Sequence, residues 1–173
     1  MYAQGHAGLT LILMSLLMIP FEYNTINILI IVLAAGLSTL LDIDLQWQRQ
    51  GYPFHHRGRT HSILAALIAG VLFGIFMWYG FKEILYFGIG FIAGFMAVVS
   101  HMLGDLLTHM AFKPLWPFDK REVSFGICSA SNRAANEGLG TVGTLAFFVY
   151  ILNGQGSLSV FIDAIKSLFR ILE

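Results

Sequence analysis

The sequence predicts an all-α integral membrane protein, a helical bundle of about five spans with a C-terminal interfacial or embedded helix. Of its 173 residues, 57% are hydrophobic and 12% are charged, whereas soluble domains average about 45–50% and about 25%. The apolar runs are unbroken rather than alternating, which indicates helices, because lipid cannot satisfy an open backbone. Ten basic residues balance ten acidic ones and there is one cysteine, which excludes a nucleic-acid-binding basic face, an internal disulfide framework and a zinc ribbon.

Five apolar runs give the predicted spans in chain order, and we expect them to form one domain over residues 1–173. They cover residues 8–19, 26–41, 63–81, 84–107 and 139–152. The first and fifth are shorter than the roughly 20 residues that cross a typical bilayer. Flanking residues, or burial within the bundle, could complete them.

The first run ends at Pro20, and the second ends in the acidic segment Asp42-Ile43-Asp44. The third carries no charge, and polar residues appear in the fourth only near its end. A polar pair, Asn153-Gly154, closes the fifth. Residues 157–172 then place apolar side chains on one side of a helix and charges elsewhere, which predicts an interfacial helix or a sixth embedded one.

The connections between the spans are of two kinds. Residues 21–25 and 82–83 are short links, which predict antiparallel hairpins, while residues 42–62 and 108–138 are long and polar. Loops of that length in a compact domain usually carry function. The long connections hold seven Lys and Arg residues against one in the short links. The positive-inside rule therefore predicts a multi-pass protein of the inner cell membrane with both long loops in the cytoplasm.

Metal-ligating residue types gather on that predicted cytoplasmic side. All six histidines lie there, together with several carboxylates: His6, Asp42, Asp44, His55, His56, His61, His101, Asp105, His109 and Glu137. His101 and Asp105 are four residues apart, so they share a helix face, and His109 follows if the helix continues. Carboxylates crowded at a membrane helix end repel each other, and a divalent cation removes that repulsion. Mixed imidazole and carboxylate ligands suit Zn²⁺ first, with Mn²⁺ or Fe²⁺ as alternatives.

We assign two groups of site residues from this pattern. The predicted ligands of one or two ions are His6, Asp44, His61, His101, Asp105, His109 and Glu137. The predicted catalytic group, which would move protons or neutralise developing negative charge, is Asp42, His56, Arg57 and Arg59. No role is assigned to His55. Alternatives stay open: the arginines could meet lipid headgroups, and His101 with Asp105 could form a structural hydrogen-bonded pair.

Several motifs together resemble the YdjM family of membrane-bound metal-dependent hydrolases. The most specific is His56-Arg57-Gly58-x-Thr60-His61-Ser62. The others are an early His6, Asp42-x-Asp44, His101-x-x-x-Asp105-x-x-Thr108 and Trp116-Pro117-Phe118. The order of ligands is also distantly similar to that of zinc-dependent phospholipase C and P1 nuclease, which implies hydrolysis of phosphoester bonds. The chain departs from those enzymes by lacking an N-terminal Trp and by having Glu137 in place of a final pair of ligands.

The resulting expectation is a membrane-bound metal-dependent hydrolase acting on a phosphoester. A site at headgroup level favours a lipid substrate. The alternatives are a divalent-cation transporter and a structural protein in which a metal only holds the loops against the helices. A transporter predicts polar residues deep inside the spans, and the runs at 26–41 and 63–81 are almost wholly apolar. The sequence does not predict an oligomeric state.

Overall fold

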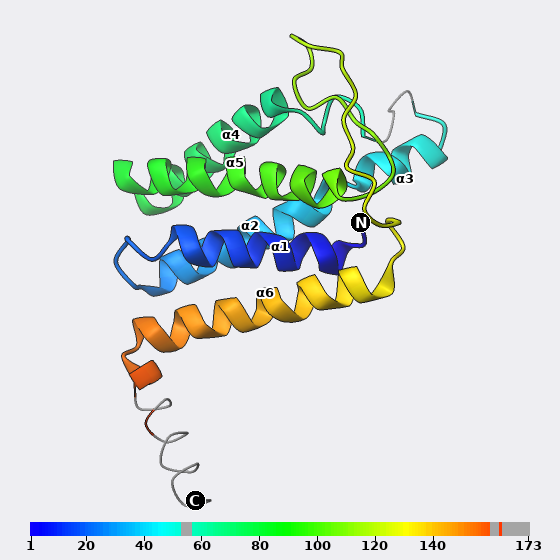
Figure 1. Ribbon diagram of the computed structural model, residues 1–173. Helices are drawn as coiled ribbons and strands as arrows, with labels where there is room; N and C mark the ends of the chain where they lie inside the picture. The colour runs from blue at the N-terminus through cyan, green and yellow to red at the C-terminus, as the bar shows by residue number, and fades with distance from the viewer. Residues whose placement is uncertain (53–56, 160–162, 164–173) are drawn as a thin grey trace, which may run out of the picture.

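The protein is an all-α bundle, as the sequence predicts. The computed structural model describes residues 1–52, 57–159 and 163, and its described helices are α1 (Ala3–Leu17), α2 (Thr25–Leu40), α3 (Ile43–Arg49), α4 (Ile63–Phe81), α5 (Ile84–Leu106) and α6 (Arg133–Gly154). Helices α1, α2, α4, α5 and α6 run side by side, and short α3 projects from one end (Figure 1). Within the described residues, β-pairing is limited to isolated bridges between Thr108 and Cys128 and between Phe112 and Val123.

Four stretches of the described chain are long and apolar enough to cross a membrane. They are Thr25–Gln48, Ile63–Phe81, Ile84–Leu106 and Arg133–Gly154. Helix α6 begins six residues before the predicted run at 139, so it reaches 22 residues. Helix α1 has 15 residues and is a shorter apolar helix.

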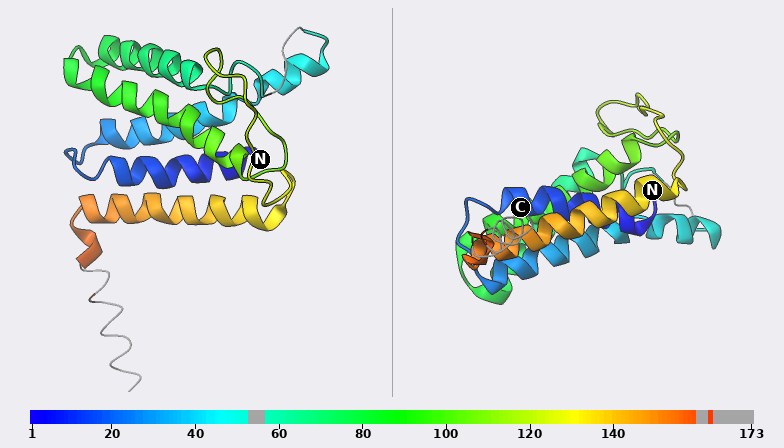
Figure 2. Two further views of the ribbon diagram at one scale, coloured as in Figure 1. Left: turned by 45° about the horizontal axis from the view of Figure 1, so that its top comes forward. Right: turned by 60° about the horizontal axis from the view of Figure 1, so that its bottom comes forward.

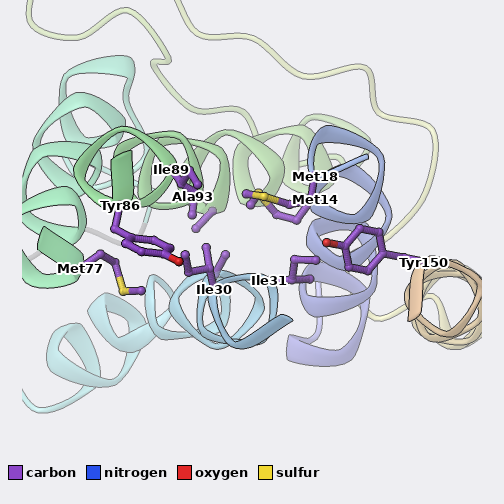
Figure 3. Packing of buried hydrophobic residues seen from close by; sticks show 11 residues of the cluster. Met14, Met18, Ile30, Ile31, Met77, Tyr86, Ile89, Ala93 and Tyr150 are labelled. Atoms are coloured by element: carbon purple, nitrogen blue, oxygen red, sulfur yellow. The ribbon is translucent and has the colours of Figure 1, made fainter. Parts of the chain in front are cut away.

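Helices α1, α2 and α5 form the centre of the bundle, because each contacts the other two. Helix α4 packs against α5 on one flank, and α6 packs against α1 on the other (Figure 2). The main apolar core lies between these helices. It is shown in Figure 3 and includes Met14, Met18, Ile30, Ile31, Ala34, Met77, Tyr86, Ile89, Ala93, Ala97 and Tyr150.

The helix ends follow from local capping. The side chains of Asn24, Ser62 and Asn132 accept hydrogen bonds from backbone N–H groups in the first turns of α2, α4 and α6. Helix α4 ends at Phe81 and is capped by Lys82, which has a left-handed φ of 61°, and α5 begins at Ile84. This tight link makes the α4–α5 hairpin that the sequence predicts.

Both long connections lie at one end of the bundle, next to the N-terminus (Figures 1 and 2). The short links lie at the other end. One feature differs from the sequence analysis at the first of these ends, because helix α3 occupies part of the predicted loop at 42–62. Helix α5 matches the predicted run at 84–107 and stops at Leu106, so it does not continue to His109. The helix predicted over 157–172 falls almost entirely outside the described residues.

Candidate metal centre

Helix α5 supplies the two central side chains of the site. His101 and Asp105 are one turn apart and fully buried, and His101 Nε2 lies 3.7 Å from Asp105 Oδ2. The ring of His101 is held in place through the nitrogen that faces away from Asp105, because its Nδ1 lies 2.7 Å from the carbonyl oxygen of Ser38 on α2. The position of this ring therefore depends on the contact between α2 and α5.

Helix α1 brings a second imidazole against the first. The rings of His6 and His101 are stacked, with centroids 3.7 Å apart and planes 13° from parallel. His6 is fully buried, yet neither of its ring nitrogens has a hydrogen-bond partner among the described residues. A buried imidazole normally satisfies at least one nitrogen. A ligand held between His6 Nε2 and the nearby carboxylates would satisfy this one, because Nε2 lies 3.5 Å from Asp105 Oδ1.

Asp42, just after α2, completes a group of four side chains. Asp42 Oδ1 lies 3.4 Å from His101 Nε2, and its Oδ2 lies 3.8 Å from His6 Nε2. One ligand atom from each of His6, Asp42, His101 and Asp105 lies within 4.8 Å of the others. Asp42 is 27% exposed while the other three are fully buried, so Asp42 marks the open side of the group.

His61 borders this group from the segment before α4. Its Nε2 lies 3.0 Å from His101 Nε2 and 3.4 Å from Asp105 Oδ2. On the other side of the ring, Nδ1 lies 3.0 Å from Thr60 Oγ1, and the Thr60 hydroxyl donates to Asp44 Oδ2 at 2.7 Å. Burial lowers the pKa of His61, which keeps the ring neutral and able to ligate a metal near pH 7.

The hydrogen-bond partners assign the ring tautomers. Since the Ser38 carbonyl can only accept, His101 Nδ1 carries the hydrogen and Nε2 keeps its lone pair. The Thr60–Asp44 chain places the His61 hydrogen on Nδ1 in the same way. Two Nε2 lone pairs then face each other across 3.0 Å, a repulsion that a cation bound by both nitrogens would relieve. Two nitrogens bonded to one tetrahedral Zn²⁺ at about 2.0–2.1 Å are ~3.3 Å apart, which is close to this separation.

Positive charge holds the outer oxygen of Asp105. Arg57 Nη2 donates to Asp105 Oδ1 at 2.6 Å, and the Met1 amino group lies 2.8 Å from the same oxygen. Arg57 Nη1 also donates to Thr108 Oγ1 at 2.9 Å and to the Met110 carbonyl. Asp105 Oδ2, in contrast, has no hydrogen-bond partner within the described chain. This oxygen is therefore the one available to a metal.

The comparisons with known proteins give one match. A sequence model of the YdjM inner membrane protein family matches residues 1–162. The chain belongs to the YdjM inner membrane protein family. No curated protein and no solved structure matches it. The buried His and Asp side chains described above therefore belong to a YdjM family protein with a possible metal-binding group.

The structure distributes the predicted site residues of this YdjM protein unevenly. It brings His6, Asp42, His61, His101 and Asp105 together, with Asp44 behind His61. Asp42 thus takes the place in the group that the sequence analysis gives to Asp44. Arg57 contacts Asp105, whereas Arg59 is exposed with its guanidinium 5.3 Å from the Trp116 ring. His56 lies outside the described residues, and so does His55.

Two predicted ligands are not brought to the group. His109 follows the end of α5 at Leu106, is exposed, and so does not continue the face of His101 and Asp105. Glu137 is half exposed on α6, where it accepts from Arg133 Nε at 2.6 Å. Its neighbour Asn136 points inward instead, and its Oδ1 accepts from the backbone N–H of Tyr2 at 2.7 Å.

Gly104 has a positioning role that the sequence analysis does not assign. It faces His6 between the two ligands of α5, and a Cβ added there would lie 2.9 Å from His6 Nδ1 and 3.2 Å from its Cε1. The absence of a side chain at 104 is what allows the His6 ring to stack on His101. A larger residue must push the imidazole out of place.

We therefore expect Gly104→Ala to weaken metal binding by about 10–100-fold. The melting temperature should change little, because the preference of a helix for Ala over Gly, up to ~1 kcal/mol, offsets part of the cost of overpacking, about 1–3 kcal/mol. Zn²⁺ titration of the detergent-purified protein measures the affinity. The matched control is Gly88→Ala on the same helix, where an added Cβ meets nothing within 4 Å. Equal Zn²⁺ affinities for Gly104→Ala and the wild type would contradict this role.

Proposed function

We propose that this protein is a membrane-bound metal-dependent hydrolase that cleaves a phosphoester, with a lipid headgroup as the expected substrate. The observation that carries the proposal is the group of His6, Asp42, His101 and Asp105, whose ligand atoms lie within 4.8 Å of one another and of which all but Asp42 are buried. The unpartnered nitrogens of His6 and the facing Nε2 atoms of His61 and His101 support a cation at this place. Mixed nitrogen and oxygen donors favour Zn²⁺, with Mn²⁺ or Fe²⁺ as alternatives, and one or two ions.

The chemistry proposed is attack of water on phosphorus. A bound divalent ion would supply an acidified water and polarise a phosphoryl oxygen. The oxygen of that water forms a bond to phosphorus while the bond from phosphorus to the ester oxygen breaks. Asp42, the partly exposed member of the group, would accept the proton of the water and return it to the leaving alkoxide, so that phosphoester and water give an alcohol and a phosphate.

The other side chains keep this geometry. Arg57 holds Asp105 Oδ1 and so directs Oδ2 toward the two histidines. Ser38 fixes the ring of His101, and Thr60 with Asp44 fixes the ring of His61. Hydrogen bonds of this kind to ligating histidines set their tautomer and orientation. Arg59 remains exposed and can meet the negative charge of a substrate.

The proposed membrane placement puts this end of the bundle at the inner leaflet, facing the cytoplasm. The excess of Lys and Arg in the long connections supports that orientation. The loop after α5 carries exposed apolar side chains, among them Phe118, which is 89% exposed. Together with Trp116 it suits the headgroup region. A site at this level would meet lipid phosphoesters first.

One experiment tests the proposal directly. The detergent-purified protein is analysed for metals and then assayed with a model phosphodiester and with phospholipids. We expect one or two ions per chain and release of product, and a loss of about 10²–10⁴-fold in rate for Asp42→Asn, the range for removing a general base. Glu137→Gln, which changes a carboxylate outside the group, should leave the rate unchanged.

Other outcomes would overturn the hydrolase proposal. Bound metal without product from either substrate, together with a melting temperature that falls on chelation, would indicate a metal that only staples the loops. Accumulation of the metal inside proteoliposomes would indicate a divalent-cation transporter. An undiminished rate for Asp42→Asn would remove this residue from the proton transfer.

A further inference from the structure

Two hollows meet at the side of α4, beside the metal centre. The first is a basic cavity of about 330 Å³ lined by Arg57, Arg59, Lys113, Trp116 and Glu122 among others. The second, of about 300 Å³, is an apolar groove along α4 that begins at the same Arg59 and Trp116. Charged and apolar surfaces are thus joined through two shared side chains.

The groove is lined by a row of apolar side chains on one face of α4. Leu64, Ile68 and Leu72 line it at intervals of four residues, and such residues lie one above the other on a helix. The row extends about 12 Å along the axis at about 1.5 Å per residue. Since α4 is a candidate membrane span, this face meets lipid chains.

Among the described residues that line the head of the groove, Arg59 is the available cation. Lys113 Nζ is 3.3 Å from Glu122 Oε1, so that pair is compensated. The Arg57 guanidinium is buried against Asp105. Arg59, by contrast, is exposed, and its guanidinium lies over the Trp116 ring at 5.3 Å. A single negatively charged phosphate matches this arrangement, because the arginine fork binds phosphate in a bidentate manner.

We propose that the basic cavity and the α4 groove together bind one phospholipid, with its phosphate at Arg59 and an acyl chain along Leu64, Ile68 and Leu72. The cavity borders the metal centre, because Arg57 lines it and also donates to Asp105 Oδ1 at 2.6 Å. The bound lipid is the substrate of the proposed hydrolase, so the catalytic meaning of this site rests on the proposed function. Lipid binding itself requires no turnover.

Native mass spectrometry of the detergent-purified protein tests the site with three probes. They are phosphatidic acid, diacylglycerol with the same chains, and soluble glycerol phosphate. We expect saturable binding of phosphatidic acid that is at least about tenfold tighter than binding of the other two probes. Diacylglycerol lacks the phosphate that would contact Arg59, and glycerol phosphate lacks the acyl chain that would fill the groove. Equal binding of phosphatidic acid and diacylglycerol would overturn the phosphate contact, and equal binding of glycerol phosphate would overturn the groove.

Two variants with matched controls locate the binding. Arg59→Gln removes the headgroup charge, and Ile68→Trp fills the groove; each should weaken phosphatidic acid binding about tenfold or more. Arg121→Gln removes an exposed arginine from the same end of the bundle, and Leu67→Trp enlarges the exposed neighbour of Ile68 outside the groove. Both controls should bind as the wild type does. Wild-type binding by Arg59→Gln or Ile68→Trp, at unchanged melting temperature, would overturn the proposal.

The failure of this inference and that of the proposed function can be told apart. Saturable lipid binding that depends on Arg59 and Ile68, without product from any phosphoester, would leave the lipid site standing and end the hydrolase proposal. Hydrolysis of a soluble phosphodiester by a protein that shows no lipid preference would support the hydrolase proposal and end the lipid-site proposal.

Discussion

Replacing Asp105 by alanine is expected to remove the bound metal, reduce hydrolysis to background, and lower the free energy of unfolding by about 3–5 kcal/mol. The carboxylate is the partner of the buried Arg57 guanidinium, at 2.6 Å, and of the Met1 amino group, at 2.8 Å. Alanine leaves these positive charges buried without their partner, and an uncompensated buried charge strongly destabilises the folded state. Elemental analysis gives the metal per chain, and a thermal melt in detergent gives the stability.

A second substitution separates the two effects. Asp105→Asn keeps the shape and an oxygen that can accept from Arg57, so it should lose the metal with a smaller loss of stability. Asp119→Ala is the matched control, because this partly exposed carboxylate lies at the same end of the bundle, outside the group, and pairs with Arg121 at 2.6 Å. It should change neither metal content nor melting temperature. Retention of metal and of wild-type hydrolysis by Asp105→Ala would exclude it from the site.

The helices were predictable because their apolar runs are bounded by strong local signals. Helix α4 has the predicted bounds, Ile63–Phe81, since Ser62 caps its start and Lys82 ends it in a left-handed conformation. Helix α6 is longer than its apolar run predicts, because its first turns carry charged and polar residues such as Arg133 and Asn136. The projecting helix α3 is partly polar, so the apolar pattern predicts a loop there for the same reason.

The site was predictable as a gathering of ligand types at one end of the bundle, but not in its detailed roles. Asp42 and Asp44 are two residues apart at a helix start, and only the path of the chain decides which one enters the group. The helical period of His101 and Asp105 predicts His109 as a third ligand only if the helix continues. Thr108 ends that period, because its N–H and its hydroxyl both bond to the Asp105 carbonyl and the chain then pairs with Cys128.

The roles of Ser38 and Gly104 depend on contacts between helices, which spacing along one helix does not reveal. Ser38 acts through its backbone carbonyl, so its side chain gives no signal at all. Gly104 does give a weak one: a residue without a side chain, between two ligands of one helix, indicates that another group approaches closely. The sequence does not predict that this group is His6 from α1.

Gly143→Leu is expected to have the other large effect, by forcing α6 away from α1. A Cβ at 143 would lie 2.1 Å from the Gly8 carbonyl oxygen and 2.5 Å from its Cα. These are backbone atoms, so no change of rotamer can relieve the clash. Overpacking costs about 1–3 kcal/mol even where side chains can adjust, and we expect a larger loss here, seen as a lower melting temperature or a loss of folded protein.

The same substitution should also reduce metal binding, although α6 supplies none of the side chains gathered around His101. Helix α1 carries His6 two residues before Gly8, and it packs against α6 along its length. A displaced α1 therefore carries the His6 ring away from His101. Gly143→Ala is the milder variant if leucine prevents folding, and Gly138→Leu is the matched control, since an added Cβ there meets nothing within 4 Å. Full metal content in a folded Gly143→Leu protein would show that α6 does not position the site.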